Sequence, residues 1–390
     1  MSQEQSGAKW RSHQCRGHGA QMNDLPESLA IAGAWGYIGR KFLDVALRRQ
    51  LRTYVYDPGN VPEDVDPRAV TRLPDEAEFY RLPADLFHLA THPDHRQTGQ
   101  QILLERAQHE PLAILNEKPM AAPESPEDCP RIVAAARNSR MLMLYDFPEL
   151  YDPLTERVMD HLNSYRDVRI TDISLCRSKD REAPDNPRNY KRMVPIQYQE
   201  SVHCLAYVLF LLARVRGSVA EVLDDGVGIR AEAESYAPPN PERYPYVVDG
   251  NCRYQLSLGS LKIEGLTDFK AGAEFTKRRV LRGSGDGQPF RIEAEYLEGH
   301  KRLNINGVEQ TVDPRVNSYE SVLQTFTRWR SQLAREALME GIYPNPAFAR
   351  ITYQLSSALW RASRSRSVIR FADLDQLLKF DAGFRDTLSN

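Results

Sequence analysis

A lysine and a histidine, 85 residues apart, carry side chains suited to the oxidation of an alcohol. Lys118 belongs to NEKPMA (116–121), directly after an apolar run, and His203 lies in QYQESVHCLAY (197–207). When an alcohol is oxidised, its carbon loses a hydride, its hydroxyl proton goes to a base and an alkoxide develops. A lysine ammonium can stabilise that alkoxide, and an imidazole with an ordinary pKa near 6.5 can accept the proton at neutral pH.

Three glycines offer a site for the phosphates of a dinucleotide. Gly33, Gly36 and Gly39 follow a G-x-x-G-x-x-G spacing in GAWGYIG, between an apolar run and a helical pattern. Such a turn lets the backbone approach a pyrophosphate, while the first N–H groups of the following helix face the anion. The residues expected to contact a cofactor here are Gly33, Ala34, Trp35, Gly36, Tyr37 and Ile38. The alternative is a glycine-rich turn that only packs a helix against a strand.

An acidic residue bears on the choice of cofactor. Asp57 lies 24 residues after Gly33, at the end of TYVYD (53–57), where an acid would accept hydrogen bonds from the adenosine ribose hydroxyls. Its charge would repel a 2′-phosphate, and no arginine follows it in DPGN, so NAD is favoured over NADP. The same residues also fit a turn formed by Asp-Pro-Gly.

The elements that must position these residues alternate between strand and helix over residues 28–148. Short apolar runs predict strands at 29–33, 53–57, 86–91, 112–118 and 141–147, with helical patterns between them. This order predicts an α/β domain of the Rossmann type, with a doubly wound parallel sheet. Lys118 would then lie at the carboxyl end of a parallel strand, in the crevice where such sheets bind ligands.

The pattern changes over residues 149–390, where we predict a second, α+β domain for substrate binding and oligomerisation. Strand-like segments separated by turn signals such as Asn306-Gly307 and GSGDGQ predict a mixed, mainly antiparallel sheet. A helix should begin at Pro153 with Asp152 as its N-cap. Longer helices are expected at about 198–214, 319–338 and 346–363.

Composition narrows the class of protein. At 390 residues two domains are expected, and 51 Lys+Arg against 53 Asp+Glu argue against a nucleic-acid partner. The most apolar stretch, 208–215, is much shorter than the roughly 20 residues that cross a bilayer, so no membrane partner is expected. Five scattered cysteines fit reduced thiols and a cytoplasmic location.

The first 27 residues are expected to form a disordered tail without a secretory signal, and Met22 is a candidate natural start. His13, Cys15 and His18 in this tail are too few for a structural zinc site, so no metal is predicted.

Several motifs together resemble the glucose-fructose oxidoreductase/inositol dehydrogenase family (Gfo/Idh/MocA). They are the glycine turn, LATHPDHR (89–96), NEKPMA, the helix with His203, and the closing segment YPNPAFARITYQLSSALWRASRSRSVIRF. The resemblance covers nearly the whole chain from residue 28, and Glu-Lys-Pro is its most specific part. Members are mostly NAD(P)-dependent dehydrogenases of sugars, inositols and related polyols, so the resemblance implies a sugar-like substrate and a homo-oligomer, a dimer or tetramer.

The resemblance also implies roles for single residues. Glu117 would lie near the nicotinamide ribose, Lys118 would contact the reacting hydroxyl, and His203 would be the general acid/base. Thr91 and Pro93 match the segment that passes beside the cofactor in relatives, and Pro119 would fix the turn, with a cis peptide as one way to do so. The alternatives are a surface ion pair at a strand end and a structural histidine.

The chain departs from the family beside the histidine. Gln199 stands where an aspartate is usual, and Ala206 where a second acid often follows. Spaced i and i+4, Gln199 and His203 would share a helix face and both contact substrate. We hypothesise that Glu200 or Tyr207 partly replaces the missing acid. Basic residues in the preceding loop fit an anionic substrate, solvated charges or an oligomer contact; they are Arg181, Arg188, Lys191 and Arg192.

The sequence therefore predicts an NAD(P)-dependent oxidoreductase of carbohydrate metabolism, acting on a hydroxyl or keto group of a sugar, sugar derivative or cyclitol. Two alternatives stay open. One is an enzyme of the same family that retains its NAD through a cycle of redox-assisted glycoside hydrolysis or transfer. The other is a non-catalytic, nucleotide-sensing regulator, which Gln199 and Ala206 favour and the joint presence of Lys118 and His203 disfavours.

Overall fold

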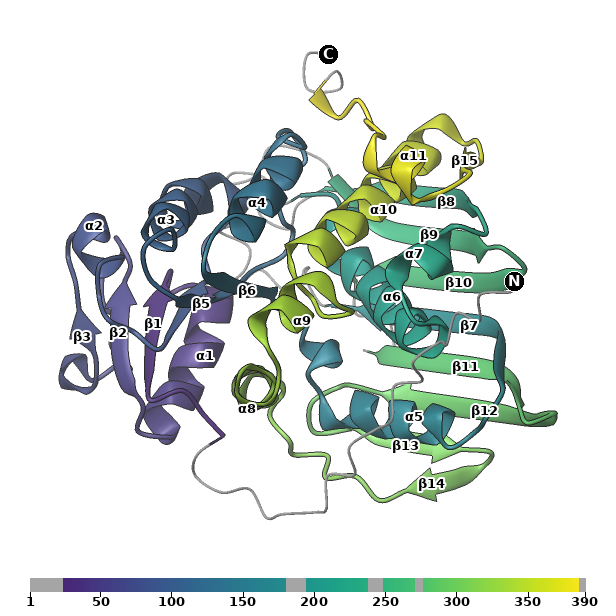
Figure 1. The fold of residues 1–390 in the computed structure, drawn as a ribbon, viewed down its shortest axis with the longest axis horizontal. Helices are drawn as coiled ribbons and strands as arrows, with labels where there is room; N and C mark the ends of the chain where they lie inside the picture. The colour runs from purple at the N-terminus through teal and green to yellow at the C-terminus, as the bar shows by residue number, and fades with distance from the viewer. Residues whose placement is uncertain (1–23, 180–193, 238–247, 271–275, 386–390) are drawn as a thin grey trace, which may run out of the picture.

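The computed structural model describes residues 24–179, 194–237, 248–270 and 276–385, and it places helices between and around two separate sheets (Figure 1). The first sheet has the order β3-β2-β1-β4-β5-β6, and all its neighbouring strands are parallel. Its strands are β1 (Ser28–Ala32), β2 (Arg52–Tyr56), β3 (Thr71–Arg72), β4 (Leu86–Leu89), β5 (Leu112–Asn116) and β6 (Met141–Tyr145). The predicted doubly wound sheet is confirmed.

Helices cover both faces of this sheet. They are α1 (Tyr37–Arg48), α2 (Glu76–Phe79), α3 (Pro93–Arg106) and α4 (Asp128–Arg137). Because both faces are covered, every residue of β1, β5 and β6 is buried, which explains their continuous apolar sequences. Both β3 and α2 were missed, since they are too short to show a period.

The second sheet has nine strands in the order β14-β13-β12-β11-β7-β10-β9-β8-β15. Only the β7 and β10 pair is parallel, so the predicted mixed, mainly antiparallel sheet is confirmed. At the predicted hairpin turn, Asn306 and Gly307 have φ of 54° and 83°, as a two-residue turn of this kind requires. The strands are β7 (Val168–Ser178), β8 (Val227–Tyr236), β9 (Val248–Leu258), β10 (Leu261–Asp268), β11 (Lys277–Gly285), β12 (Gln288–Glu295), β13 (Arg302–Ile305), β14 (Val308–Gln310) and β15 (Ile369–Phe371).

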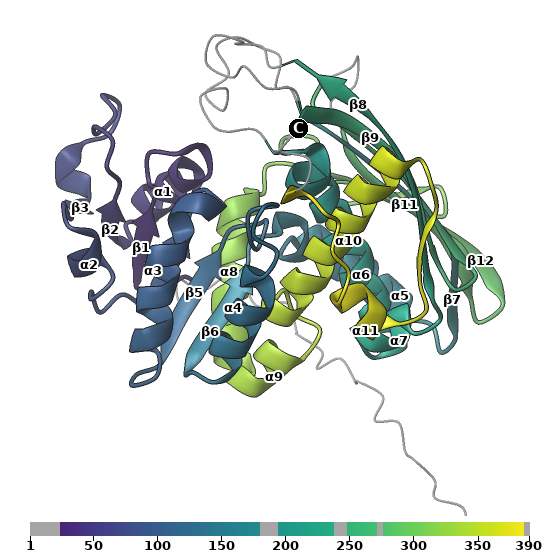
Figure 2. The same ribbon diagram turned by 90° about the horizontal axis from the view of Figure 1, so that it is seen from above.

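Helices cover the face of this sheet that is turned towards the first sheet (Figure 2). They are α5 (Pro153–Asn163), α6 (Val202–Arg216), α7 (Val219–Leu223) and α10 (Pro346–Ser365), followed by the short α11 (Leu374–Leu378). The helix α6 is buried from Val202 to Ala213, because it lies between α10 and the sheet. The predicted cap of α5 is confirmed, since the Asp152 carboxylate accepts a hydrogen bond from the Leu154 N–H at 3.0 Å.

The chain returns to the first sheet after β14. The helix predicted over 319–338 is interrupted, because Leu333 is extended between α8 (Ser318–Gln332) and α9 (Arg335–Glu340). The carboxylate of Glu320, on α8, accepts hydrogen bonds from Arg48 of α1 at 3.0 Å and from Arg49, directly after α1, at 2.8 Å. Residues 318–345 therefore belong to the packing of both halves, and the domain borders at 27/28 and 148/149 remain a prediction.

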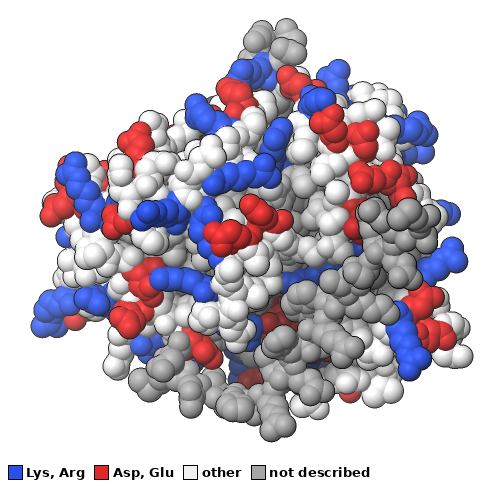
Figure 3. Space-filling view, in the orientation of Figure 1, with Lys and Arg blue, Asp and Glu red and all other residues white. Residues whose placement is uncertain are grey.

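Charges of both signs are interspersed over the face shown in Figure 3, without one basic patch. No helix in the described ranges is long and apolar enough to cross a membrane. The four described cysteines, at positions 129, 176, 204 and 252, are free thiols, as predicted. Residues 1–23, with His13, Cys15 and His18, lie outside the described residues, as do Arg181, Arg188, Lys191 and Arg192.

Candidate active site

The glycine turn after β1 is packed too closely for side chains at two positions. Gly33 has φ +77°, and a Cβ there would lie 3.0 Å from the Thr91 Cγ2 and 3.1 Å from the Ala90 carbonyl oxygen. A Cβ on Gly39 would come well within 3.0 Å of the Gly33 carbonyl oxygen. These glycines let α1 and the loop after β4 close on the end of β1, at the switch point where sheets of this order bind dinucleotides.

The other residues of the turn lie at or near the surface of this crevice. Gly36 is the N-cap of α1, and the first helical residues, Tyr37 and Ile38, are half-buried and line a cleft described below. Ala34 is buried and Trp35 is half-buried. The arrangement directs the N–H groups of the first turn of α1 towards the crevice, as an anion site requires.

Asp57 lies directly after β2 and holds the turn in place. Its carboxylate accepts hydrogen bonds from the Trp35 N–H at 3.0 Å and from the Gly59 N–H at 2.8 Å. Arg72 of β3 donates to the carbonyl oxygen of Gly59 at 2.9 Å. The sequence did not indicate Arg72, because it lies 15 residues after Asp57 and reaches the loop only through the pairing of β2 with β3. A cation therefore stands beside the acid expected to choose the cofactor.

The Glu-Lys-Pro segment follows β5, and its Lys118–Pro119 peptide is cis. Arg96 of α3, which is 1% exposed, fixes this turn by hydrogen bonding. It donates to the Asn116 Oδ1 at 3.1 Å, to the Pro119 carbonyl oxygen at 2.6 Å and to the carbonyl oxygen of Glu117. A buried guanidinium thus sets the path of the backbone that carries Lys118.

Two predicted cofactor contacts lie on the neighbouring loop after β4. The hydroxyl of Thr91 is buried and has no hydrogen-bond partner in the described part of the chain. Pro93 is the first residue of α3, and His92 is its N-cap. An unsatisfied buried hydroxyl next to Gly33 fits a loop whose polar partner is a bound ligand.

Glu117 is 5% exposed and contacts a buried histidine. Its carboxylate lies 3.1 Å from the Nε2 of His88, a buried residue of β4 that the sequence did not indicate. Burial and the charge of Glu117 raise the pKa of Asp146 well above its ordinary value. Burial alone would raise the pKa of Glu117, but the hydrogen bond and charge of His88 outweigh it and lower the pKa. The pKa values of these two carboxyl groups therefore shift in opposite directions.

His88, Glu117 and Asp146 also form a set of residue types that bind metals. Their potential ligand atoms all lie within 4.8 Å of one another. The hydrogen bond between His88 and Glu117 and the pairing of β5 with β6 account for this proximity without an ion. The expectation of no metal site remains a prediction.

His203 lies on α6 and is 3% exposed. Its Nδ1 is 4.0 Å from the Oε2 of Glu149, and its ring meets the edge of Phe147 with the ring centroids 6.0 Å apart. Burial, followed by the positive charges of Arg177 and Lys118, lowers the pKa of His203 well below 6.5. The imidazole is therefore neutral at pH 7 and can accept a proton.

Lys118 reaches the beginning of the same helix. Its Nζ donates to the backbone carbonyl oxygen of Gln199 at 2.6 Å. Residues Gln197–Ser201 form a single π-helical turn before α6, a feature that is frequent at functional sites. The π turn departs from the α-helical register expected from residue 198. The helix face expected to be shared by Gln199 and His203 stays a prediction. Gln199 contacts Lys118 through its backbone carbonyl oxygen.

The structure also corrects the hypothesis about a replacement acid. Glu200 accepts a hydrogen bond from the Arg177 Nε at 2.7 Å, and the hydroxyl of Tyr207 lies 3.3 Å from that of Tyr296. The carboxylate beside His203 is instead that of Glu149, which is 4% exposed. It comes from the loop after β6 and was not indicated by the sequence, because 54 residues separate it from His203.

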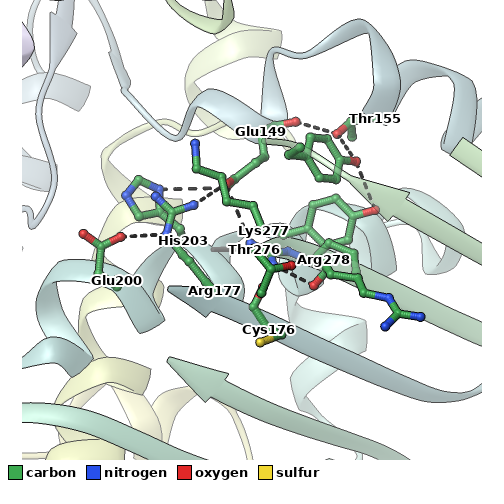
Figure 4. A network of polar contacts seen from close by, with 12 residues as sticks. Glu149, Thr155, Cys176, Arg177, Glu200, His203, Thr276, Lys277 and Arg278 are labelled. Carbon is green, nitrogen blue, oxygen red and sulfur yellow. Dashed lines mark hydrogen bonds and ion pairs between the residues drawn. The ribbon is translucent and has the colours of Figure 1, made fainter. Parts of the chain in front are cut away.

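Figure 4 shows how the acids and bases around His203 form one network. Arg177 of β7, 3% exposed, bridges Glu149 and Glu200. Arg279 of β11 lies 3.7 Å from Glu149, and Lys179 lies 3.4 Å from Glu200. Each buried carboxylate thus has more than one cationic neighbour, and the charges of Arg177 and Arg279 lower the pKa of Glu149 despite its burial.

A cleft of about 380 Å³ brings the pieces together between the carboxyl end of the first sheet and the beginning of β11. Its lining includes Tyr37, Ile38 and Lys41 of α1, Glu117, Lys118, Asp146 and Glu149 of the strand ends, and Arg177, Lys179, His203, Lys277 and Tyr296 of the second half. Gly33, Asp57 and Thr91 lie outside this cleft. The predicted residues thus fall into a cofactor group around the glycine turn and a reaction group around Lys118.

No protein-family model matches the sequence, and no curated protein matches it. Solved structures do. A myo-inositol dehydrogenase from Corynebacterium glutamicum aligns with a TM-score of 0.61 at 16% identity, covering 89% of this chain and 99% of that chain. This chain has the fold of the glucose-fructose oxidoreductase/inositol dehydrogenase family.

Other solved structures with this fold carry names that indicate different functions. UDP-N-acetylglucosamine 3-dehydrogenase from Acidithiobacillus ferrooxidans aligns with a TM-score of 0.64 at 10% identity, over 87% of this chain and 98% of that chain. A mutant of Gal80p from Saccharomyces cerevisiae aligns with a TM-score of 0.65 at 13% identity, over 91% and 100%. Gal80p from a second yeast is described as a transcriptional regulator. The predicted resemblance is confirmed for the fold.

Proposed function

We propose that this protein is an NAD(P)-dependent oxidoreductase acting on a hydroxyl or keto group of a sugar, sugar derivative or cyclitol. One observation carries the proposal: a single cleft is lined by the first turn of α1, by Lys118 and by His203. These are the three parts that hydride transfer from an alcohol needs, namely a dinucleotide site, a cation and a base. Similar structures include dehydrogenases named for myo-inositol and UDP-N-acetylglucosamine.

The glycine turn fits a dinucleotide, because Gly33 and Gly39 admit no side chain and the Thr91 hydroxyl is left for a ligand. Residues Gly33 to Ile38, with Thr91 and Pro93, would hold the cofactor. Bound there, its nicotinamide would supply the hydride acceptor. Asp57 favours NAD through its charge, although Arg72 beside it offers a cation that a 2′-phosphate could use.

In this mechanism the Lys118 ammonium stabilises the developing alkoxide, and the Gln199 carbonyl holds that ammonium in place. Neutral His203 accepts the hydroxyl proton, and Glu149 stabilises the imidazolium that results. In the reverse direction His203 donates the proton to the forming alkoxide. Gln199 then acts through Lys118, and Glu117 acts by anchoring the turn before Lys118 rather than by an exposed charge.

The test measures absorbance at 340 nm with NAD or NADP against a panel of sugars, cyclitols, uronates and sugar phosphates. We expect NADH formation with at least one compound, lost in Lys118→Met and in His203→Gln. Lys262→Met is the matched control, because Lys262 is exposed on β10 and lies outside the cleft. A signal that survives in Lys118→Met would contradict the assignment of Lys118.

A regulator that senses a dinucleotide is the second candidate. The similarity to Gal80p favours it, as does the absence of an acidic side chain at Gln199. A regulator of this kind would bind NADH, as measured by fluorescence, and would turn over no compound in the panel. If NAD(H) instead co-purifies and stays bound while no net reduction is seen, the enzyme with a retained cofactor gains support. The homo-oligomer and the cytoplasmic location remain predictions, of which size-exclusion chromatography tests the first.

A further inference from the structure

Lys277 is a cation in the cleft to which the mechanism assigns no task. It is the first residue of β11 and pairs in register with Arg177 of β7. Its backbone N–H is held by the Glu295 carboxylate at 2.7 Å, which fixes where the side chain starts. The side chain is half-buried and lines the cleft together with His203 and Glu149, and Figure 4 shows these residues in one cluster.

The carboxylates nearest to Lys277 already have cationic partners. Glu149 is paired with Arg177 and lies 3.7 Å from Arg279. Glu200 is paired with Arg177 at 2.7 Å and with Lys179 at 3.4 Å. Within the described ranges, three cations therefore share these two carboxylates before Lys277 is counted.

The ammonium of Lys277 makes no hydrogen bond or ion pair with any residue in the described ranges. Burial and the charge of Arg177 lower its pKa and outweigh the charges of Glu149 and Glu200, which act in the opposite direction. Lys118, whose ammonium lines the same cleft, adds to the positive charge. A half-buried cation that no described carboxylate pairs directly is unfavourable, and an anion bound in the cleft would relieve the cost.

We propose that the cleft contains an oxyanion subsite, in which Lys277 binds a carboxylate or phosphate group of the substrate while a hydroxyl of the same molecule lies between Lys118 and His203. This rests on the proposed function and narrows its substrate class to acidic sugars or acidic cyclitols. Lys179 lines the same cleft beside Arg177, with its ammonium 3.4 Å from Glu200. A volume of about 380 Å³ lies in the range of small-molecule sites and admits a substrate of monosaccharide size.

Binding is tested by isothermal titration calorimetry on the full chain with glucose, glucuronate and glucose 6-phosphate. Saturating NADH is included so that anions do not bind at the glycine turn. We expect an acidic probe to bind the wild type at least tenfold more tightly than glucose. Lys277→Met should weaken that binding by about 10- to 100-fold, the range of a hydrogen bond to a charged group, and should leave glucose binding within twofold. Lys277→Arg should retain part of the affinity, and Lys262→Met should retain all of it.

The two acidic probes distinguish the sources of the oxyanion, since preference for glucuronate assigns a carboxylate and preference for glucose 6-phosphate a phosphate. The proposal is overturned if neither acid binds more tightly than glucose, or if Lys277→Met binds the preferred acid as the wild type does. Failure of the proposed function looks different. Acid binding would still depend on Lys277, while no compound would give NADH and Lys118→Met would change nothing.

Discussion

Replacement of Glu149 by glutamine tests whether its carboxylate takes part in catalysis or only stabilises the fold. Glu149 is 4% exposed, and its Oε2 lies 4.0 Å from the Nδ1 of His203. Glutamine keeps the shape of the side chain and removes its charge. When His203 takes a proton from substrate, the imidazolium in the variant lacks this neighbouring anion, so the rate should fall without a change in how the cofactor binds.

The distance sets the size of the effect. Two unit charges 4.0 Å apart interact by about 4 kcal/mol at an effective dielectric constant of about 20. This equals about 3 pKa units for His203, since one unit is about 1.4 kcal/mol. Arg177 and Arg279 already neutralise part of the Glu149 charge, so we expect a loss nearer 10- to 100-fold in kcat/KM. Because the pKa of His203 falls further, the acid limb of the pH profile should move to lower pH.

The assay is kcat/KM for the substrate found in the panel, measured by NADH formation from pH 5 to pH 9. Glu200→Gln is the matched control, because Glu200 is equally buried and binds the same Arg177. Each variant removes one partner of a buried guanidinium that keeps another, so both should lose about 2 to 3 kcal/mol in urea unfolding. Only Glu149→Gln should lose most of its activity. A folded Glu149→Gln variant within threefold of wild-type kcat/KM, with an unmoved acid limb, would refute the reasoning.

Four further outcomes follow from the site. Lys118→Met should lower kcat by about 100- to 1000-fold while NADH fluorescence titrations give an unchanged dissociation constant, because the ammonium acts on the developing alkoxide. Gly39→Ala should abolish NADH binding and lower the free energy of unfolding by about 1 to 3 kcal/mol, because the new Cβ would clash with the Gly33 carbonyl oxygen. Normal NADH binding in this variant would contradict the close packing of the turn. Asp57→Asn should raise the ratio of kcat/KM with NADP to that with NAD by about tenfold or more, and an unchanged ratio would remove Asp57 from cofactor choice. The free energy of unfolding should fall as the pH drops below 6.5, by up to about 1.4 kcal/mol per pH unit, because His203 has a lowered pKa when folded and the unfolded state binds the additional proton; His203→Gln should flatten this slope in urea titrations.

The sequence by itself determined the first sheet and the place of its chemistry. Apolar runs of about five residues, separated by helical patterns, predicted five of the six strands, since parallel strands covered on both faces must be apolar throughout. Strand ends in such a sheet fall at one edge, so the glycine turn and Lys118 could be assigned to the same crevice. Motif resemblance added His203, and the structure brings it to the cleft with Lys118.

Only the tertiary structure decided which groups act on these residues. Glu149 beside His203, His88 beside Glu117 and Lys277 in the cleft come from loops and strand ends far apart in the sequence, and no spacing connects them. The pKa shifts depend on the same contacts, since burial and the charge of Glu117 raise the pKa of Asp146. The π turn at Gln197–Ser201 departs from a 3.6-residue period, so the carbonyl that binds Lys118 could not be assigned from helical spacing. Local periodicity fixes elements and their exposed ends, whereas distances between charged groups exist only once the elements have packed.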